Sequence, residues 1–268
     1  DLISQALWAP HPLGQPITGT HDTLNSINRS HLFQFCQSHH FRDDVVIAAA
    51  GPYSPSEFAA ALIPFIPKQS SGRPDAATPF VYSGKSTPVV LHRDTEQLQL
   101  AIAFHTPGRH HSSRHALRLL SILLGEATSS RLFQQLREER GLCYHISSDL
   151  ALFEDTGSLE ISAGLDPDSR EEAMKAIYRE LTQLATEGPS HEELERAKKI
   201  AITAHKIALE STGAHMSWIA ESILFEGKIV TPAESRARLL PVTPGDIQKI
   251  ASMIFSPTNQ AIAEIRAI

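Results

Sequence analysis

Arg137 and Tyr144 stand seven residues apart in the most regular stretch of the chain, Ser129 to Ser148. The pattern predicts a helix that ends at Gly141 and turns directly into a strand, so Arg137 falls in the last helical turn and Tyr144 opens the strand. Arginine carries a fork of N–H donors and tyrosine an O–H donor, and such donors could bind oxygen atoms of a substrate backbone. The pattern also has a structural explanation, in which Arg137 complements the helix carboxyl terminus and Tyr144 packs in the sheet. The pattern alone favours the structural explanation.

Fourteen histidines make metal binding the next chemistry to consider. Residues 191–195, HEELE, begin like the H-E-x-x-H zinc motif, but Glu195 occupies the place of the second histidine. The inverted motif H-x-x-E-H needs a Glu directly before a His, and this dipeptide does not occur in the chain. His111 and His115 could share a helix face, yet tetrahedral zinc needs three or four ligands and no carboxylate stands nearby. We therefore expect no zinc ligand and no bound cofactor in this chain.

Composition excludes several classes of protein. A chain of 268 residues with 41% hydrophobic content can bury a sizeable core, in one large domain or two small ones. The net charge of -6 comes without a basic block, so nucleic acid is not an expected partner. No apolar run approaches the roughly 20 residues of a membrane span, so a membrane is not expected either. Cys36 and Cys143 are far apart and lie in apolar stretches, which favours buried free thiols.

Hydrophobic periodicity predicts an α+β fold with an antiparallel or mixed sheet and helices packed on one face. Short turns join consecutive strands, which is typical of antiparallel neighbours. The strands are expected at Val45–Ala50, Pro88–Arg93, Gln97–His105, His145–Phe153, Gly157–Leu165 and Asn259–Arg266. The first helix is expected from Ser30, its N-cap, to His40, and a second begins at Pro55. Further helices are expected over Ser112–Gly125, from Asp168 or Ser169 to Gly188, and from Thr243 to Phe255. The capping box of Ser190 and Glu193 begins another, which is expected to extend past Glu210.

The segment SSRLFQQLREERGLCY resembles the signature of the second domain in insulinase-like zinc peptidases. This is the pitrilysin group with the inverted zinc motif, which includes the mitochondrial processing peptidase. Further segments resemble the family in the family's own order and span nearly the whole chain: ALWAPHPLGQPITGT, FCQSHHFRDDVVIAAAG, GPSHEELERAKK and LPVTPGDIQKIASMIF.

The resemblance implies a half-enzyme of two homologous domains that closes like a clamshell on a peptide with a second half-enzyme, either a second copy or a paired subunit. Residues 1–50 would be the tail of the first, zinc-bearing domain, and residues 51–268 the second, inactive domain, with a linker at about 68–78. Zinc would serve the parent enzyme through ligands outside this chain. The first residue is not Met and DLISQALW reads as the middle of a helix, so we expect a C-terminal piece of a longer protein.

The resemblance also assigns roles to Arg137 and Tyr144, which would reach into the active site of the opposing half. There they would bind the substrate backbone and the negative charge that develops during peptide hydrolysis. With the resemblance, this role is favoured over the structural explanation. Two features depart from the family pattern: residues 126–128, EAT, replace a glycine-rich run, and His145 follows Tyr144 where a small polar residue is common.

Two functions follow. The parent is a zinc endopeptidase that takes unfolded or short peptides, and this chain is its substrate-clamping part, inactive by itself. Alternatively, the parent is a non-catalytic partner or scaffold subunit of a processing-peptidase-like complex. An unrelated α+β binding protein is a weaker alternative.

Overall fold

The computed structural model describes residues 1–39, 45–66, 79–81, 84 and 87–268. The chain divides into two compact units. The sheet unit comprises residues 1–17, 79–202 and 236–268, and the helical unit comprises residues 18–78 and 203–235. The predicted linker at 68–78 lies outside the described residues, and the predicted domain boundary at residue 50 stays a prediction.

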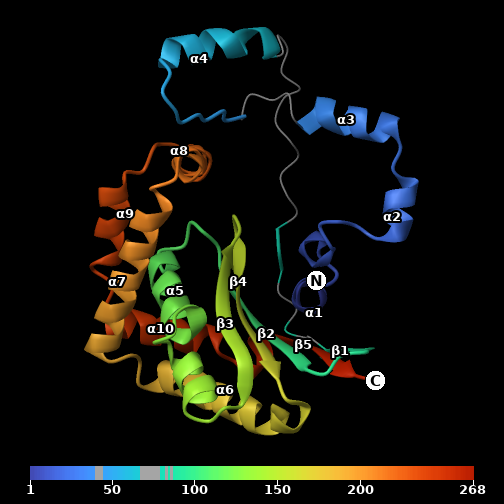
Figure 1. Ribbon diagram of the computed structural model, residues 1–268, viewed down its shortest axis with the longest axis vertical. Helices are drawn as coiled ribbons and strands as arrows, with labels where there is room; N and C mark the ends of the chain where they lie inside the picture. Colours follow the sequence, from blue (N-terminus) through green and yellow to red (C-terminus); the bar gives the residue numbers. More distant parts are fainter. Residues whose placement is uncertain (40–44, 67–78, 82–83, 85–86) are drawn as a thin grey trace. The chain divides into compact units, whose positions relative to one another are not determined.

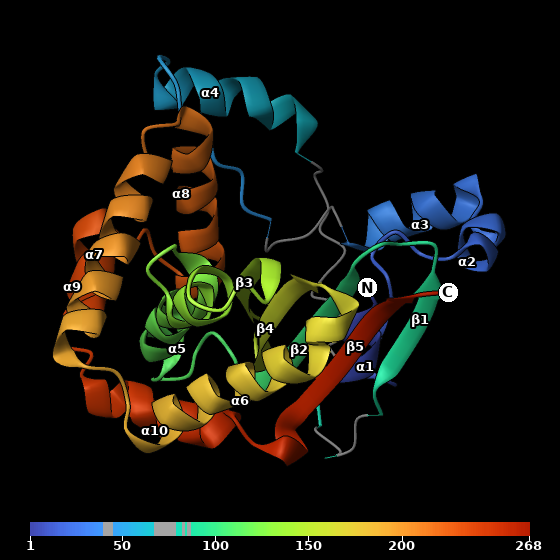
Figure 2. The same ribbon diagram turned by 60° about the horizontal axis from the view of Figure 1, so that its bottom comes forward.

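The sheet unit is built on a mixed sheet whose five described strands have the order β1-β5-β2-β4-β3. Its strands are β1 (Val89–Arg93), β2 (Leu98–Pro107), β3 (Cys143–Leu152), β4 (Thr156–Leu165) and β5 (Gln260–Ala267). All neighbours are antiparallel except β1 and β5, which are parallel. β3 therefore forms one edge of the sheet, beside β4, as Figures 1 and 2 show. The predicted α+β class with a mixed sheet is confirmed.

Helices α5 (Arg114–Ser121), α6 (Arg170–Thr186) and α10 (Pro244–Ile254) cover one face of this sheet. The apolar side chains of α5 are buried together with Ile102 and Phe104 of β2 and Leu159 and Ile161 of β4. This face holds the main hydrophobic core, and burial of such side chains contributes about 1.5–3 kcal/mol each.

Helix α1 (Leu2–Trp8) covers the opposite face of the sheet. Ile3, Leu7 and Trp8 are buried against small residues of β2 and β5, namely Ala103, Ala261 and Ala263. The ring of Trp8 also meets the imidazole of His105 edge-on, with 4.8 Å between ring centroids. Because both faces of β2 are covered here, its later residues are buried on both sides and its alternation disappears.

The helical unit corrects two predictions. Helix α3 (Arg29–His39) begins before Ser30, and the side chain of Asn28 caps it by accepting a hydrogen bond from the His31 N–H at 3.1 Å. The apolar run Val45–Ala50 is not a strand, since these residues are irregular and partly exposed. A strand needs a neighbour for its backbone groups, and within the described part of this unit there are only helices and loops.

The remaining described helices complete the architecture. They are α2 (His21–Ser26), α4 (Pro55–Leu62), α7 (His191–Ala208), α8 (Thr212–Glu226) and α9 (Pro232–Leu239), with short 3-10 turns at Pro12–Gly14, Ile63–Phe65, Pro167–Ser169 and Pro257–Asn259. The predicted capping box of Ser190 and Glu193 begins α7, and Thr243 caps α10 as predicted. None of the helices in the described ranges is both long and apolar enough to cross a membrane.

Candidate functional site

The predicted corner between helix and strand is present in the sheet unit. Its helix ends in the π-helical turn η4 (Phe133–Glu138), a rare geometry that is found often at functional sites. Gly141 has φ of +63°, in the left-handed region, and β3 then begins at Cys143. Leu136 and Leu142 are buried, and the Leu142 N–H donates to the Leu136 carbonyl at 2.8 Å. These contacts hold the corner on the core.

A β-bulge displays Tyr144 at the start of β3. In the ladder with β4, Cys143 pairs with Leu165 and His145 pairs with Gly164, so Tyr144 is an extra residue without a partner in the ladder. Side chains of a strand alternate, and Tyr144 would otherwise point inward with the buried Ile146. The bulge turns it outward instead, and Tyr144 is 61% exposed. The structural explanation required Tyr144 to pack in the sheet. Its exposure shows that it does not.

The side chain of Arg137 is exposed on the π-helical turn that precedes this strand. Its guanidinium carbon is 4.9 Å from the centroid of the Phe133 ring. Burial raises the pKa of the Cys143 thiol, and the positive charge of Arg137 partly opposes that rise. Arg137 is thus near enough to act electrostatically on Cys143, the residue next to Tyr144. In the described part of the structure, neither Arg137 nor Tyr144 has a hydrogen-bond acceptor or an ion-pair partner.

An open cavity of about 520 Å³ adjoins the corner. Phe133 lines it from the helix and residues 145–150 line it from β3, so both sides of the corner contribute to it. The segment 126–128, which departs from the family pattern, forms another wall, where Glu126 pairs with Arg118. Gly125 brings this wall against β3, because a Cβ there would lie only 2.5 Å from the Ser148 nitrogen.

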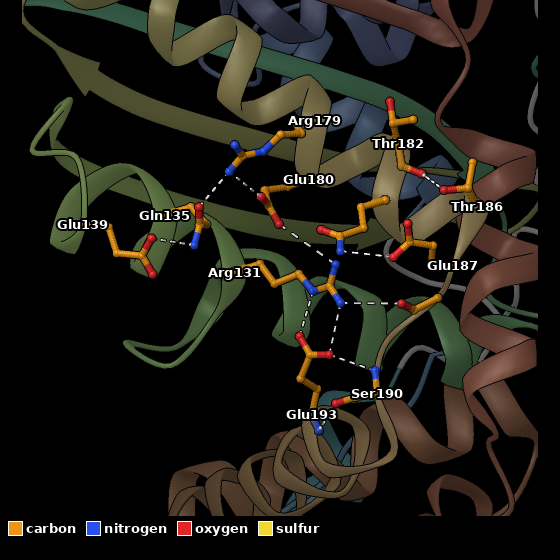
Figure 3. A network of polar contacts seen from close by, with 12 residues as sticks. Arg131, Gln135, Glu139, Arg179, Glu180, Thr182, Thr186, Glu187, Ser190 and Glu193 are labelled. Atoms are coloured by element: carbon orange, nitrogen blue, oxygen red, sulfur yellow. Dashed lines mark hydrogen bonds and ion pairs between the residues drawn. The ribbon is translucent and has the colours of Figure 1, made fainter.

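A buried ion-pair network fixes the beginning of the corner helix (Figure 3). The side chain of Arg131 is 13% exposed, and its guanidinium donates two hydrogen bonds to the Glu193 carboxylate of α7, at 2.7 and 3.0 Å. Burial opposes ionisation of Glu193, but the bonds from Arg131 and from the Ser190 N–H outweigh it and lower the pKa of Glu193. A carboxylate of α6, Glu180, lies 4.0 Å from the other side of Arg131. Three segments are thereby joined behind the corner.

Metal ligands do not converge in the part of the chain that the structure describes. No group of three His, Cys, Asp or Glu side chains there could hold an ion. The Nδ1 atom of His111 shares a hydrogen bond with the Ser113 hydroxyl at 2.7 Å, and His115 accepts one from Arg114 at 3.2 Å. The donor set that a zinc ion requires is not offered by these residues.

Sequence reasoning placed Arg137 and Tyr144 on either side of the corner and missed three residues that define its geometry. Phe133 stands four residues before Arg137, a spacing at which helical side chains meet, and that signal was available. The pairing of Arg131 with Glu193 joins residues 62 apart, and a single sequence carries no sign of it. The bulge at Tyr144 was also invisible, because no glycine or proline marks it.

The structure thus shows an α+β domain in which no group of three side chains among the described residues could hold a metal ion. The family model "Peptidase M16 inactive domain" matches residues 26–201. The chain belongs to this family, which is the insulinase-like family that the resemblance indicated.

Curated relatives and solved structures agree with this assignment. The chain is 32% identical over 257 residues to an uncharacterized zinc protease, YmxG, of Bacillus subtilis, covering 96% of this chain and 62% of that protein. It is 30% identical over 258 residues to an uncharacterized zinc protease of Streptomyces coelicolor, covering 94% and 56%. The chain thus spans about three fifths of the length of these relatives.

The fold is shared with solved structures at lower identity. A protease from Helicobacter pylori superposes with a TM-score of 0.84 at 18% identity, covering 98% of this chain and 65% of that one. A peptidase M16 inactive domain from Pseudomonas fluorescens gives 0.81 at 18%, covering 99% and 64%. A chain of complex III from Candida albicans gives 0.84 at 19%, covering 98% and 64%.

Proposed function

We propose that this chain is the substrate-clamping part of a zinc endopeptidase, and that Arg137 and Tyr144 bind the backbone of the peptide substrate. The observation that carries the proposal is the outward display of two hydrogen-bond donors at one corner. The bulge turns Tyr144 away from the core. Arg137 is exposed on the helical turn that precedes this strand, and its side chain has no acceptor in the described structure. Unused donors at an exposed corner are suited to oxygen atoms of a ligand.

The chemistry of the two side chains fits a peptide carbonyl. An arginine can donate two parallel N–H groups to one ligand, and a tyrosine adds an O–H from a second direction. Donors that are already in place when negative charge develops on a carbonyl oxygen lower the barrier, and loss of one such donor costs about 10²- to 10³-fold in rate in other hydrolases. On this proposal, the chain orients the peptide and stabilises that charge.

The proposal includes partners that the chain does not contain. The curated relatives of greater length carry the name zinc protease, which supports a parent enzyme whose zinc is bound by another part of the protein or by a paired subunit. The described residues supply no metal site. The proposed partners are therefore a zinc-bearing domain, a second half-enzyme as a copy or a different subunit, and a peptide substrate.

Cleavage of an unstructured peptide by the full-length protein tests the proposal. Arg137→Ala and Tyr144→Phe are each expected to lower kcat/KM by about 10²-fold while the thermal midpoint is unchanged. Arg196→Ala is a matched control, because Arg196 is a partly exposed arginine of the same unit whose nearest carboxylate, Glu192, is 3.7 Å away. Unchanged turnover in either test variant, with the thermal midpoint intact, contradicts the role assigned to the corner.

A second candidate function is a non-catalytic subunit of a larger complex. The likeness to a chain of complex III supports it, at a level of identity that shows the fold alone. The two candidates differ in the remaining sequence of the full-length protein: an H-x-x-E-H motif there supports the peptidase, and its absence supports the scaffold.

A further inference from the structure

We propose that Phe133 is a positioning residue that holds the guanidinium of Arg137 ready for the substrate. This inference rests on the proposed function of Arg137 and adds a residue to it. It concerns how the corner keeps a long, flexible cation in one place without using up the hydrogen bonds that a ligand needs.

Arginines near the corner are held in two different ways. Arg131 donates to Glu193, and the guanidinium of Arg140 lies 3.6 Å from the Glu172 carboxylate. Arg137, between them, has no carboxylate partner and no hydrogen-bond acceptor within the described ranges, and it lies over the ring of Phe133. An ion pair occupies the N–H groups of a guanidinium, whereas an aromatic ring contacts its flat face and leaves the N–H edge open.

The ring of Phe133 is suited to this task because it is itself fixed. Phe133 is half-buried and packs against the main hydrophobic core, next to the fully buried Leu132. Arg137 is exposed, and an exposed arginine gives up about 2 kcal/mol of rotamer entropy when it is held. A platform that is anchored before the substrate arrives removes part of this cost from the binding step.

The ring that contacts the guanidinium also lines a cavity that it shares with the strand. Phe133 is one turn before Arg137 on the helix, and its ring lines the cavity that His145 lines from β3. Burial raises the pKa of the Cys143 thiol at the start of β3, and the positive charge of Arg137 opposes part of that rise. The ring that holds the cation therefore faces the same cavity as β3, the strand on which the bulge displays Tyr144.

A double-mutant cycle on the full-length protein tests the proposal through peptide turnover. Phe133→Leu is expected to lower kcat/KM about two- to fivefold, the size of an exposed cation–π contact, mainly through kcat. Phe133→Tyr keeps the ring and is the matched control, with activity near wild type. In an Arg137→Ala background, Phe133→Leu is expected to have no further effect, because the side chain that it positions is gone.

A second readout does not depend on activity. The NMR signal of the Arg137 Nε–H group is expected to lie upfield because of the ring current, and to move toward the random-coil value in Phe133→Leu but not in Phe133→Tyr. Should Phe133→Leu fail to fold, fluorinated phenylalanines at position 133 keep the volume and weaken the negative ring face. Turnover is then expected to fall stepwise with fluorine content.

The outcomes separate this inference from the proposed function. If Arg137→Ala leaves turnover unchanged, the proposed function itself is wrong. If Arg137→Ala lowers turnover but Phe133→Leu has the same effect with or without Arg137, Phe133 acts on stability alone and the positioning role is overturned. An Arg137 signal that does not respond to removal of the ring overturns it as well.

Discussion

The guanidinium of Arg137 lies 4.9 Å from the centre of the Phe133 ring, on the π-helical turn that ends the corner helix. The contact explains how Arg137 can be exposed, lack a carboxylate partner among the described residues and still have a defined place. The neighbouring β-bulge does the equivalent for Tyr144, because it fixes the direction of the side chain through the backbone. The aromatic contact and the β-bulge thus expose one hydrogen-bond donor each at this corner of the sheet.

Removal of the buried cation behind the corner is expected to be costly. Arg131→Met leaves the Glu193 carboxylate half-buried without its partner, and the free energy of unfolding should fall by about 3–5 kcal/mol. Chemical denaturation monitored by circular dichroism measures the change. Arg196→Met, which removes a more exposed i,i+4 pair with Glu192, should cost at most about 0.5 kcal/mol. An equal loss of unfolding free energy in the two variants would show that the network in Figure 3 contributes no more to stability than an exposed ion pair.

Stability is expected to fall in mild acid because of His105. The imidazole is 7% exposed between the rings of Trp8 and Phe80, and burial lowers its pKa from 6.5 to about 4, with a hydrogen bond to the Leu7 backbone opposing part of that shift. Between these values the unfolded chain binds the proton and the folded chain does not. The stabilisation is therefore complete above about pH 6.5 and is lost as the pH falls toward 4, by at most about 3 kcal/mol.

Thermal denaturation at pH 7 and pH 5 measures this effect. His105→Leu is expected to show a smaller loss of stability between the two pH values than the parent protein, because it has no proton to bind at this position. His191→Leu, an exposed histidine at the start of α7, is the control and should keep the full dependence. An unchanged pH dependence in His105→Leu would contradict the assignment.

Gly141 is expected to be required for its backbone conformation alone. Its φ is +63°, and a Cβ at this position would meet nothing within 4 Å, so steric exclusion by neighbours plays no part. Gly141→Ala should cost about 1–2 kcal/mol, the penalty of a left-handed conformation for an L-residue. At Gly213 in α8 the φ is not positive and a Cβ would make only an ordinary contact of 3.6 Å with the Ser211 hydroxyl, so Gly213→Ala should be neutral or slightly stabilising. If both substitutions change the free energy of unfolding in urea equally, the positive φ of Gly141 is not the reason for its requirement.

Much of the fold follows from local sequence patterns. Alternation predicted β2, and side-chain caps predicted the starts of α7 and α10, because each signal lies within a few residues of the element that it marks. The run Val45–Ala50 failed as a predictor, since an apolar run forms a strand only when a neighbouring strand satisfies its backbone. Here the apolar pattern predicted neither burial nor a pairing partner, since Val45 and Ile47 are about half exposed.

The sequence predicted which residues form the corner, but it did not predict the direction in which their side chains point. The spacing of Arg137, Gly141 and Tyr144 indicated a corner, but the outward turn of Tyr144 depends on the register between β3 and β4. That register is set by pairing across the sheet, which a single sequence does not display. The ion pair between Arg131 and Glu193 is likewise a contact between residues far apart in the sequence. From the sequence alone, each of these charges could equally well have been exposed to solvent.

The most direct test of the account is a double-mutant cycle between Arg137→Ala and Tyr144→Phe, with kcat/KM for peptide cleavage by the full-length protein as the measured quantity. Both donors are proposed to act on the same peptide, so the two losses should be non-additive, and the double variant should be less impaired than the product of the single effects predicts. The account is contradicted if either single variant cleaves the peptide at the wild-type rate, or if the two effects multiply independently.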